Sequence, residues 1–383
     1  MQIVIAPDKF KGTLLAREVA DAMAAGVRAV VPDAEIDLCP LSDGGEGFVE
    51  ALINATHGTL VNARVTGPLP EMKVDSTYGL LGTVDAASPT TAVIEMSAAS
   101  GLSLLSPDQY DPLATTTFGT GELIAHAIHG GAKQILLGIG GSATIDAGIG
   151  AAHACGFTIL MRHGEPTPLS EPLCGRDVEQ VLMVKHGRGE VTNGVTITVA
   201  CDVTNPLFGP QGAAKIYGPQ KGASAKSVEY FDRVFADFVA RTGTQSAAKT
   251  PGAGAAGGLG FGLLAFFGAE LQNGFDIVAR ATQLQNRLAN ATLVLTGEGR
   301  FDASSLHGKV AARVANLAHD RRVDCIAICG DRESDLRDPQ FTHLASLTDV
   351  VSKEIALGDT RRQLAARTAS VVERWLKETQ RMR

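Results

Sequence analysis

Strand and helix patterns alternate at both ends of the chain, and this alternation restricts the fold more than any other feature of the sequence. Apolar runs typical of buried strands lie at residues 2–7, 35–41, 291–299 and 323–330. Apolar residues at helical spacing lie at 16–30, 46–58 and 309–319, and an amphipathic helix closes the chain. Strands that alternate with helices favour a parallel sheet with helices on both faces, so we expect an α/β fold.

The middle of the chain begins with a different pattern. Segments 60–67, 73–81 and 91–97 resemble strands with no room for helices between them, which indicates a hairpin region. Strand patterns at 134–141 and 195–203 return to the α/β rhythm. We therefore predict two α/β domains: a doubly wound parallel-sheet domain built from both chain ends, 1–57 plus 291–383, and a mixed α/β domain inserted at 58–290.

Charge and composition exclude several classes of protein. The net charge of −7 on 383 residues argues against nucleic-acid binding, because nucleic-acid-binding proteins gain affinity by neutralising phosphates. No apolar run approaches the length of a membrane-spanning helix or a signal peptide, and the six cysteines are best explained as buried, reduced thiols. We expect a cytoplasmic protein that binds small molecules and has no nucleic-acid or membrane partner; a homo-oligomer is compatible with the sequence.

Polar residues follow three of the strands predicted for the terminal domain, in the motifs IAPDKFKG (5–12), LSDGGEG (41–47) and LTGEGRFD (295–302). Ligands of open α/β sheets bind beyond the carboxyl ends of the strands, so these motifs are expected to meet at one edge of the sheet. Each motif alone is best interpreted as an ordinary polar loop, but the three together indicate a shared site. They contain Asp8, Lys9, Lys11, Asp43, Gly44, Gly45, Glu298, Arg300 and Asp302.

The third of these motifs has the residue types of a magnesium site. Glu298 and Asp302 can hold Mg²⁺, a hard ion that takes a few carboxylates together with phosphate oxygens and water. Lys309 comes at the start of the helix predicted at 309–319, where backbone N–H groups already favour anions.

Further candidates lie in the predicted inserted domain. The loop GIGGSATIDAG (138–148) can cradle a phosphate or carboxylate with its amides and hydroxyls, which belong to Gly140, Gly141, Ser142 and Thr144. The turn PGAGAAGGLGFG (251–262), with Gly257 and Gly258, is explained equally well by close packing and by phosphate contact. Asp202 is a candidate metal ligand or base, although it can also start a turn, and Lys221 lies beside a glycine.

Glycine loops, strand-end carboxylates and spare lysines together favour phosphoryl transfer. That reaction needs positioning, a metal ion that bridges phosphate oxygens, cations near the transferred group and a base beside the acceptor hydroxyl. Neither a serine–histidine–acid arrangement nor a zinc-ligand spacing in the sequence favours another chemistry.

In order and over essentially the full chain, the motifs resemble those of the bacterial type-I glycerate kinases. The matching strings are IAPDKFKGTL, LSDGGEGF, GIGGSAT, ACDVTNPLFGPQGAA, YGPQKGA, GAGAAGGLGFGL, LTGEGRFDASSLHGKV and AICG. The resemblance implies transfer of the γ-phosphoryl group of ATP to D-glycerate, giving 2-phosphoglycerate, with Mg²⁺ as the metal. It also implies that the domain built from the chain ends is flavodoxin-like.

For this reaction, roles can be assigned to the candidate residues from their positions in the predicted fold. The catalytic set contains the possible general bases and the cation of the first motif: Asp8, Asp43, Asp202 and Lys11. The residues expected to bind substrate or phosphate are Lys9, Gly44, Gly45, Gly140, Gly141, Ser142, Thr144, Lys221, Gly257, Gly258, Arg300 and Lys309. The residues expected to bind the metal are Glu298 and Asp302.

Four positions depart from the family pattern: Ile145, Ala147, Ala311 and Arg313. Ile145 removes a polar group from the rim of the GGSAT loop, and Arg313 adds a charge after the GK pair. We expect these departures to affect the choice of substrate more than the class of reaction.

Two other functions stay open at this point. Gly138, Gly140 and Ala143 match the dinucleotide fingerprint G-x-G-x-x-G/A, which suggests an NAD(P)-dependent oxidoreductase of a small hydroxy acid, although no acidic residue ends a second strand at the expected distance. A non-enzymatic nucleotide-binding regulator would bind ATP without turnover, but simple binding does not require so many strand-end carboxylates.

Overall fold

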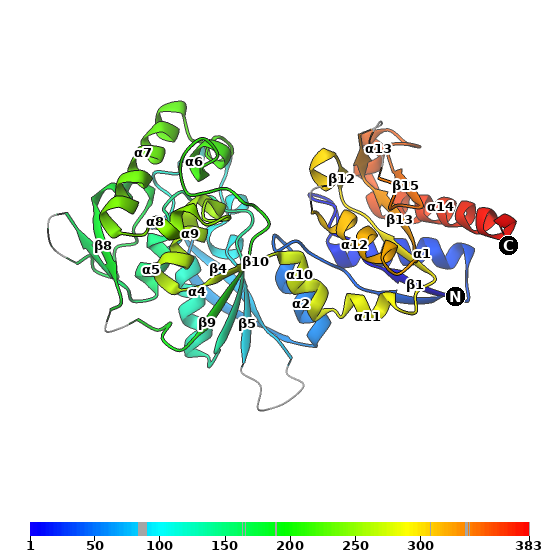
Figure 1. Cartoon of the computed structure of the whole chain (residues 1–383), viewed down its shortest axis with the longest axis horizontal. Helices are drawn as coiled ribbons and strands as arrows, with labels where there is room; N and C mark the ends of the chain where they lie inside the picture. Colours follow the sequence, from blue (N-terminus) through cyan, green and yellow to red (C-terminus); the bar gives the residue numbers. More distant parts are fainter. Residues whose placement is uncertain are drawn as a thin grey trace. The chain divides into compact units, whose positions relative to one another are not determined.

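The computed structural model describes residues 1–82, 90–162, 164, 166–187, 190–306, 308–333, 336 and 338–382. The chain divides into two compact units (Figure 1). The first unit combines Met1–Asp43 with Phe275–Arg383, and the second is Gly44–Gly274. We describe each unit by itself.

The first unit contains a five-stranded parallel sheet in the order β15-β13-β11-β1-β2. Its strands are β1 (Gln2–Ile5), β2 (Glu35–Leu38), β11 (Leu293–Thr296), β13 (Asp324–Cys329) and β15 (His343–Ser346). The first strand in the chain lies between the second and the third, which is the flavodoxin-like doubly wound order. The α/β fold with a parallel sheet is thus confirmed, and the switch point of the topology lies between β1 and β11.

Helices cover both faces of this sheet (Figure 1). Their bounds are α1 (Ala16–Val30), α10 (Gly274–Ala281), α11 (Leu284–Leu288), α12 (Val310–His319), α13 (Lys353–Gly358) and α14 (Thr360–Met382). Helices α1 and α14 share a core with the strand residues Ile5, Leu295 and Ile328. The two helices approach closely at Gly26, where an added Cβ would lie 2.3 Å from the carbonyl oxygen of Ala365. A short two-stranded sheet, β12 (Arg300–Phe301) with β14 (Asp331–Arg332), belongs to the same unit.

The second unit has a six-stranded mixed sheet in the order β10-β9-β6-β5-β4-β3. The strands are β3 (Thr59–Thr66), β4 (Lys73–Leu80), β5 (Thr91–Glu95), β6 (Gln134–Gly138), β9 (Thr196–Ala200) and β10 (Glu270–Gln272). Strands β3, β4 and β5 pair antiparallel, as the hairpin pattern predicted, and β5, β6, β9 and β10 pair parallel. A separate antiparallel pair is formed by β7 (Thr158–Met161) and β8 (Val181–Lys185).

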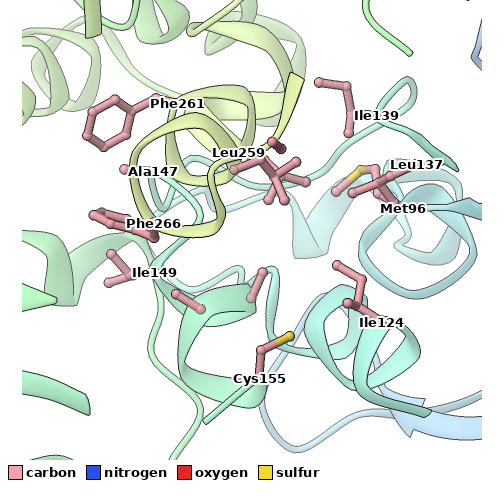
Figure 2. Close-up of a cluster of buried hydrophobic side chains, with 14 of the residues drawn as sticks. Met96, Ile124, Leu137, Ile139, Ala147, Ile149, Cys155, Leu259, Phe261 and Phe266 are labelled. Atoms are coloured by element: carbon pink, nitrogen blue, oxygen red, sulfur yellow. The ribbon is translucent and has the colours of Figure 1, made fainter. Parts of the chain in front are cut away.

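Helices of the second unit pack around a large apolar core, part of which is shown in Figure 2. Their bounds are α2 (Phe48–Thr56), α3 (Ser97–Ser100), α4 (Phe118–His129), α5 (Ile149–Ala154), α6 (Ala213–Tyr217), α7 (Ala225–Thr242), α8 (Gln245–Lys249) and α9 (Ala255–Phe267). Ala147, Leu259 and Phe261 lie in this core, so the loop that follows β6 is backed by buried apolar side chains (Figure 2).

The boundaries of the two units fall earlier in the chain than the predicted boundaries near 57 and 290. The difference is due mainly to α2, which the sequence pattern assigned to the terminal domain. Helix α2 packs on β4 and β5 of the second unit: a Cβ added to Gly79 of β4 would lie 2.5 Å from Ile53 Cδ1 and 3.3 Å from Val49 Cγ1.

The cysteines are free thiols, and five of the six are buried, while Cys201 is half-buried. Burial raises the pKa of the Cys39 thiol to about 11, which keeps this side chain neutral. None of the described helices combines the length and the apolar character that a membrane-spanning segment needs.

Candidate active site

Two buried carboxylates lie at the switch point of the first unit. Asp8 follows β1 and Glu298 follows β11, the neighbouring strand, and the Asp8 backbone N–H donates to the Gly297 carbonyl at 2.9 Å. Asp8 is 8% exposed and Glu298 is 6% exposed. The parallel pairing of β1 with β11 brings these carboxylates to one edge of the sheet, which is the place where such folds bind ligands.

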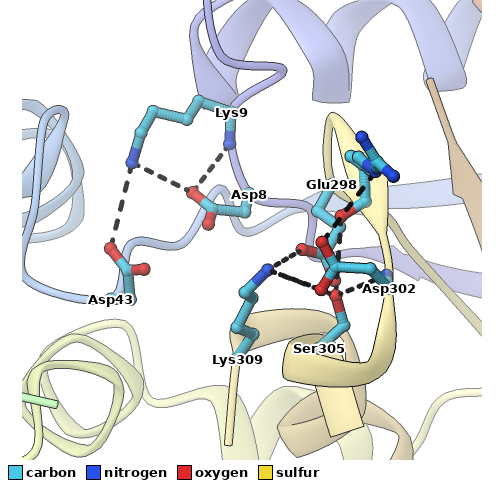
Figure 3. A network of polar contacts seen from close by, with 8 residues as sticks. Asp8, Lys9, Asp43, Glu298, Asp302, Ser305 and Lys309 are labelled. Atoms are coloured by element: carbon cyan, nitrogen blue, oxygen red, sulfur yellow. Dashed lines mark hydrogen bonds and ion pairs between the residues drawn. The ribbon is translucent and has the colours of Figure 1, made fainter. Parts of the chain in front are cut away.

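Lys9 connects Asp8 to the loop that follows β2 (Figure 3). Its ammonium Nζ lies 3.8 Å from Asp8 Oδ1 and 3.9 Å from Asp43 Oδ1, and its backbone N–H donates to Asp8 Oδ1 at 2.7 Å. The first and second motifs therefore meet, as their positions at the strand ends predicted.

Lys309, at the start of α12, lies between the two acidic residues of the third motif (Figure 3). Its Nζ is 3.5 Å from Glu298 Oε2 and 3.6 Å from Asp302 Oδ1, and it donates to Ser305 Oγ at 3.3 Å. Ser305 also accepts a hydrogen bond from the Asp302 backbone N–H at 3.1 Å. We call the residues Asp8, Lys9, Asp43, Glu298, Asp302 and Lys309 the strand-end cluster.

Burial raises the pKa of both buried carboxyl groups. The pKa of Asp8 rises to about 6 through burial, with Asp43 adding to the rise and Lys9 opposing it. The pKa of Glu298 rises to about 7, again chiefly through burial, and Lys309 opposes that rise. Neighbouring carboxyl groups with raised pKa values are typical of sites that move protons or bind cations.

The fit of this cluster to a magnesium ion can be tested on its oxygens. Within the described part of the chain, Glu298 Oε1 is buried without a hydrogen-bond partner, so one carboxylate oxygen is available to a cation. The described residues form no group of three or more histidine, cysteine or acidic side chains that could enclose a metal. Mg²⁺ commonly uses one or two carboxylates and takes its other ligands from phosphates and water, so Glu298 and Asp302 fit a shared site of this kind.

The other two predicted cations of the first unit are more exposed than Lys9 and Lys309. Lys11 and Arg300 are both exposed, and Arg300 Nε lies 3.9 Å from Asp302 Oδ2. The backbone of Lys11 nevertheless lies close to the third motif, because a Cβ added to Gly299 would be 3.0 Å from the Lys11 nitrogen. All the predicted residues of the three motifs that belong to this unit therefore lie around the ends of β1, β2 and β11.

In the second unit, Lys221 lies inside the protein behind the loop that follows β6. It is 2% exposed, and its Nζ donates to Ser142 Oγ at 2.6 Å and to the Thr144 carbonyl at 2.8 Å. Lys221, Ser142 and Thr144 were all predicted to bind substrate or phosphate. In the structure they lie together, and Lys221 forms hydrogen bonds with the other two residues.

Asp146 is a buried acid that the sequence analysis did not select. Its Oδ2 accepts from the Thr117 backbone N–H and hydroxyl, both at 2.8 Å, and its Oδ1 accepts from the Gly148 N–H at 3.0 Å. Burial raises its pKa, and these hydrogen bonds oppose the rise. Asp146 and Thr117 are 29 residues apart in the chain, and no motif in the sequence indicated that they are in contact. We call Thr117, Ser142, Thr144, Asp146 and Lys221 the loop network.

The glycines of the second unit allow segments of backbone to pack closely. An added Cβ on Gly140 would lie 2.8 Å from the Gly45 Cα, and one on Gly257 would lie 1.8 Å from the Thr144 carbonyl oxygen. Gly257 also has a positive φ of 66°, which a side chain would disfavour. Gly257 and Gly258 thus pack closely against the loop after β6, and the predicted phosphate contact stays a prediction.

The dinucleotide fingerprint is not supported by the local structure. After β6 ends at Gly138, the next helix, α5, begins only at Ile149, whereas a dinucleotide loop opens its helix directly. Asp202, at the end of β9, is exposed and accepts a hydrogen bond from the Gly274 N–H at 3.0 Å.

Two departures from the family pattern have structural explanations that differ from the expected ones. Ile145 is fully buried in the apolar core of the second unit, so it does not alter the rim of the loop. Arg313 pairs with Asp276, and its guanidinium lies 4.8 Å from the centre of the Phe275 ring. Its charge is therefore held by α10 residues of its own unit.

Comparisons with known proteins point to one family. The model of the glycerate kinase family matches residues 3–378. Glycerate 2-kinase from Escherichia coli (strain K12) is 44% identical over 340 residues, covering 88% of this chain and 87% of the relative. Glycerate kinase from Bacillus subtilis (strain 168) is 41% identical and covers 94% and 92%. A crystal structure of a protein assigned as glycerate kinase 2 from Salmonella typhimurium LT2 has a TM-score of 0.83 and 41% identity, with 99% of each chain covered.

Proposed function

The chain belongs to the glycerate kinase family, and on that premise we propose that it is an ATP-dependent glycerate 2-kinase. The observation that supports this proposal best is the strand-end cluster, in which Asp8, Glu298 and Lys309 lie at the ends of neighbouring strands. Phosphoryl transfer depends on positioned charges and a base more than on covalent chemistry of the protein, and this cluster offers both.

In the proposed reaction, the C2 hydroxyl oxygen of D-glycerate forms a bond to the γ-phosphorus of ATP. The bond between that phosphorus and the β–γ bridging oxygen breaks, and the hydroxyl proton passes to a base of the protein. The products are 2-phosphoglycerate and ADP.

Asp8 is our candidate for the base. Its pKa of about 6 leaves it largely ionised at neutral pH, while making it a stronger base than an ordinary aspartate. The other two candidates are less suited because they are more exposed: the side chain of Asp43 is 36% exposed, against 12% for Asp8, and Asp202 is exposed.

The cations of the cluster would bind the anionic groups of the substrates. Lys309 lies beside two carboxylates and can move to a phosphate oxygen, and Lys9, Lys11 and Arg300 would attract phosphate or the glycerate carboxylate. Glu298 and Asp302 are the candidate ligands of Mg²⁺, which would neutralise charge on the phosphate oxygens when bound.

A coupled assay tests the proposal. The protein is mixed with ATP, Mg²⁺, D-glycerate and enolase, without phosphoglycerate mutase, and phosphoenolpyruvate is measured. Enolase acts on 2-phosphoglycerate, so rapid formation of phosphoenolpyruvate is the expected result. Release of ADP without phosphoenolpyruvate would mean that another hydroxyl is phosphorylated. If neither ADP nor phosphoenolpyruvate forms, the proposed function is rejected.

A further inference from the structure

Lys221 is a charged side chain in a place where charges are costly. It is 2% exposed, and burial lowers the pKa of its ammonium to about 7, although the nearby carboxylate of Asp146 opposes that shift. If the role of Lys221 were only to join two segments, a neutral donor such as glutamine could make the same two hydrogen bonds without this cost. The presence of a charge here calls for a further reason.

The hydrogen bond from Lys221 determines what the Ser142 hydroxyl can do. A serine hydroxyl has one hydrogen to donate and can accept hydrogen bonds on its oxygen. Lys221 Nζ donates to Ser142 Oγ at 2.6 Å, so the Ser142 oxygen is an acceptor in this contact and the hydroxyl hydrogen must point elsewhere. An ammonium donor also polarises the hydroxyl and makes it a stronger donor.

The surroundings keep Ser142 in one position. The loop pairs with the segment after α3, where the Leu102 N–H donates to the Gly141 carbonyl at 2.8 Å and the Ala143 N–H donates to the Ser100 carbonyl at 2.9 Å. Ser142 is 8% exposed, whereas its neighbour Thr144 is fully buried. Of the two hydroxyl residues of this loop, Ser142 is therefore the one that lies closer to the surface.

We infer that Lys221 is a positioning residue that orients the Ser142 hydroxyl as a donor toward an anionic oxygen of a bound substrate. The inference rests on the proposed function, which provides two such oxygens: those of the ATP phosphates and that of the glycerate carboxylate. Lys221 acts through Ser142 and does not itself touch the ligand. The amine of Lys221 stays inside the protein, and in its protonated form it acts at the surface only through the Ser142 hydroxyl.

A double-mutant cycle tests this inference. The variants are Ser142→Ala, Lys221→Met and the double variant, and the control is Lys215→Met, which removes a more exposed lysine of α6 that pairs with Asp232. For each protein we would measure kcat, the KM for ATP and for D-glycerate, the affinity for each substrate by calorimetry, and the melting temperature.

We expect Ser142→Ala to lower kcat/KM about 10- to 100-fold, as for hydrogen bonds to charged groups, and Lys221→Met to lower it by the same factor or less. The double variant should match Ser142→Ala within about twofold, because Lys221 acts only through Ser142. Reduced affinity for ATP alone would assign the donor to a phosphate, and reduced affinity for D-glycerate alone would assign it to the carboxylate. Lys215→Met should match the wild type.

Other results would overturn the inference. If Ser142→Ala folds normally and keeps kcat, both KM values and both affinities within twofold, the hydroxyl does not contact substrate. Fully additive losses in the double variant would show that Lys221 does not act through Ser142. If Lys221→Met does not fold, the inference is tested only by the kcat, KM values and affinities of Ser142→Ala. If the wild type binds ATP or D-glycerate without turnover, the proposed function fails, but the affinities still test Ser142; if it binds neither, both proposals fail.

Discussion

The strand-end cluster and the loop network both contain buried charged groups, but these groups contact their partners at different distances. In the strand-end cluster, the ammonium and carboxylate groups of Lys9, Lys309 and their partners are 3.5 to 3.9 Å apart. In the loop network, Lys221 and Asp146 make hydrogen bonds of 2.6 to 3.0 Å. The four ion pairs of Lys9 and Lys309 in the strand-end cluster are therefore longer than the hydrogen bonds of the loop network.

Glu298 and Asp146 show two different environments of a buried carboxylate. Glu298 retains a buried oxygen with no partner among the described residues, which costs stability unless a ligand or ion completes it. Asp146, in contrast, is surrounded by donors that also fix the start of α4 and the loop before α5. Substitutions in the strand-end cluster should thus affect turnover, and loss of the Asp146 carboxylate should affect folding. Ser142 and Lys221 should affect turnover through the hydrogen bond between them.

The largest expected effect is on turnover. Replacing Asp8 by asparagine removes the proposed base without changing the shape of the side chain, so we expect kcat to fall about 10²- to 10⁴-fold. The melting temperature should stay within a few degrees of the wild type or rise, because a buried carboxyl group is lost. Steady-state kinetics at saturating ATP provide the measurement, with Asp43→Asn as the comparison. Near-native turnover of Asp8→Asn would remove Asp8 from catalysis.

The second effect is on folding. Replacing Asp146 by asparagine places an amide donor among the donors of Thr117 and Gly148 and leaves Lys221 without its counter-charge. We expect the second unit to lose about 3 to 5 kcal/mol of unfolding free energy. Urea unfolding followed by far-UV circular dichroism measures this loss. Asp232→Asn, which weakens a more exposed pair with Lys215, should cost less than about 1 kcal/mol; equal losses in the two variants would contradict the comparison.

The third effect depends on pH. The folded pKa of Glu298, about 7, lies above its ordinary value of 4.5, so the folded state binds this proton more tightly than the unfolded state. The stability that the protonated group contributes is complete below pH 4.5 and is lost as pH rises through 7. The free energy of unfolding of Glu298→Gln, taken relative to that of the wild type, should therefore increase by about 2 to 3 kcal/mol as pH rises from 5 to 8.

The fluorescence of Trp375 can follow this change, because it is the single tryptophan of the chain and is buried in the first unit. Glu18→Gln is the control, since Glu18 lies on the surface of the same unit and pairs with Arg361. If the difference in unfolding free energy between Glu298→Gln and the wild type stays constant from pH 5 to pH 8, the pKa of Glu298 is not raised.

The smallest effect concerns the pKa of Asp8. Lys9 opposes the rise in that pKa from 3.8 Å away, so Lys9→Gln should move the acidic limb of the kcat/KM profile upward from about pH 6. A shift of about 0.5 to 1 pH unit is expected for a partly exposed pair at this distance. Arg17→Gln, which removes an exposed partner of Asp21, is the control and should leave the limb in place. A downward shift for Lys9→Gln would contradict the assignment.

The sequence predicted the strand-end cluster better than the loop network, and the reason is physical. Asp8, Asp43 and Glu298 come directly after strands, and the parallel topology alone brings strand ends together. The contact between Lys221 and Ser142 joins positions 79 residues apart through side-chain packing, which no local pattern specifies. Helix α2 was assigned to the wrong side of a boundary for a similar reason, because a helical pattern does not show which sheet the helix covers.

The strand order of the first unit has a consequence for how the protein is made. Strand β1 pairs with β2 on one side and with β11 on the other, and β11 begins only at Leu293. As the chain leaves the ribosome, the inserted unit has all its residues once Gly274 has emerged, while β1 still lacks a neighbour. The inserted unit can therefore fold first, and the nascent N-terminal segment exposes an unpaired strand edge throughout that time, a state in which chains are prone to aggregate.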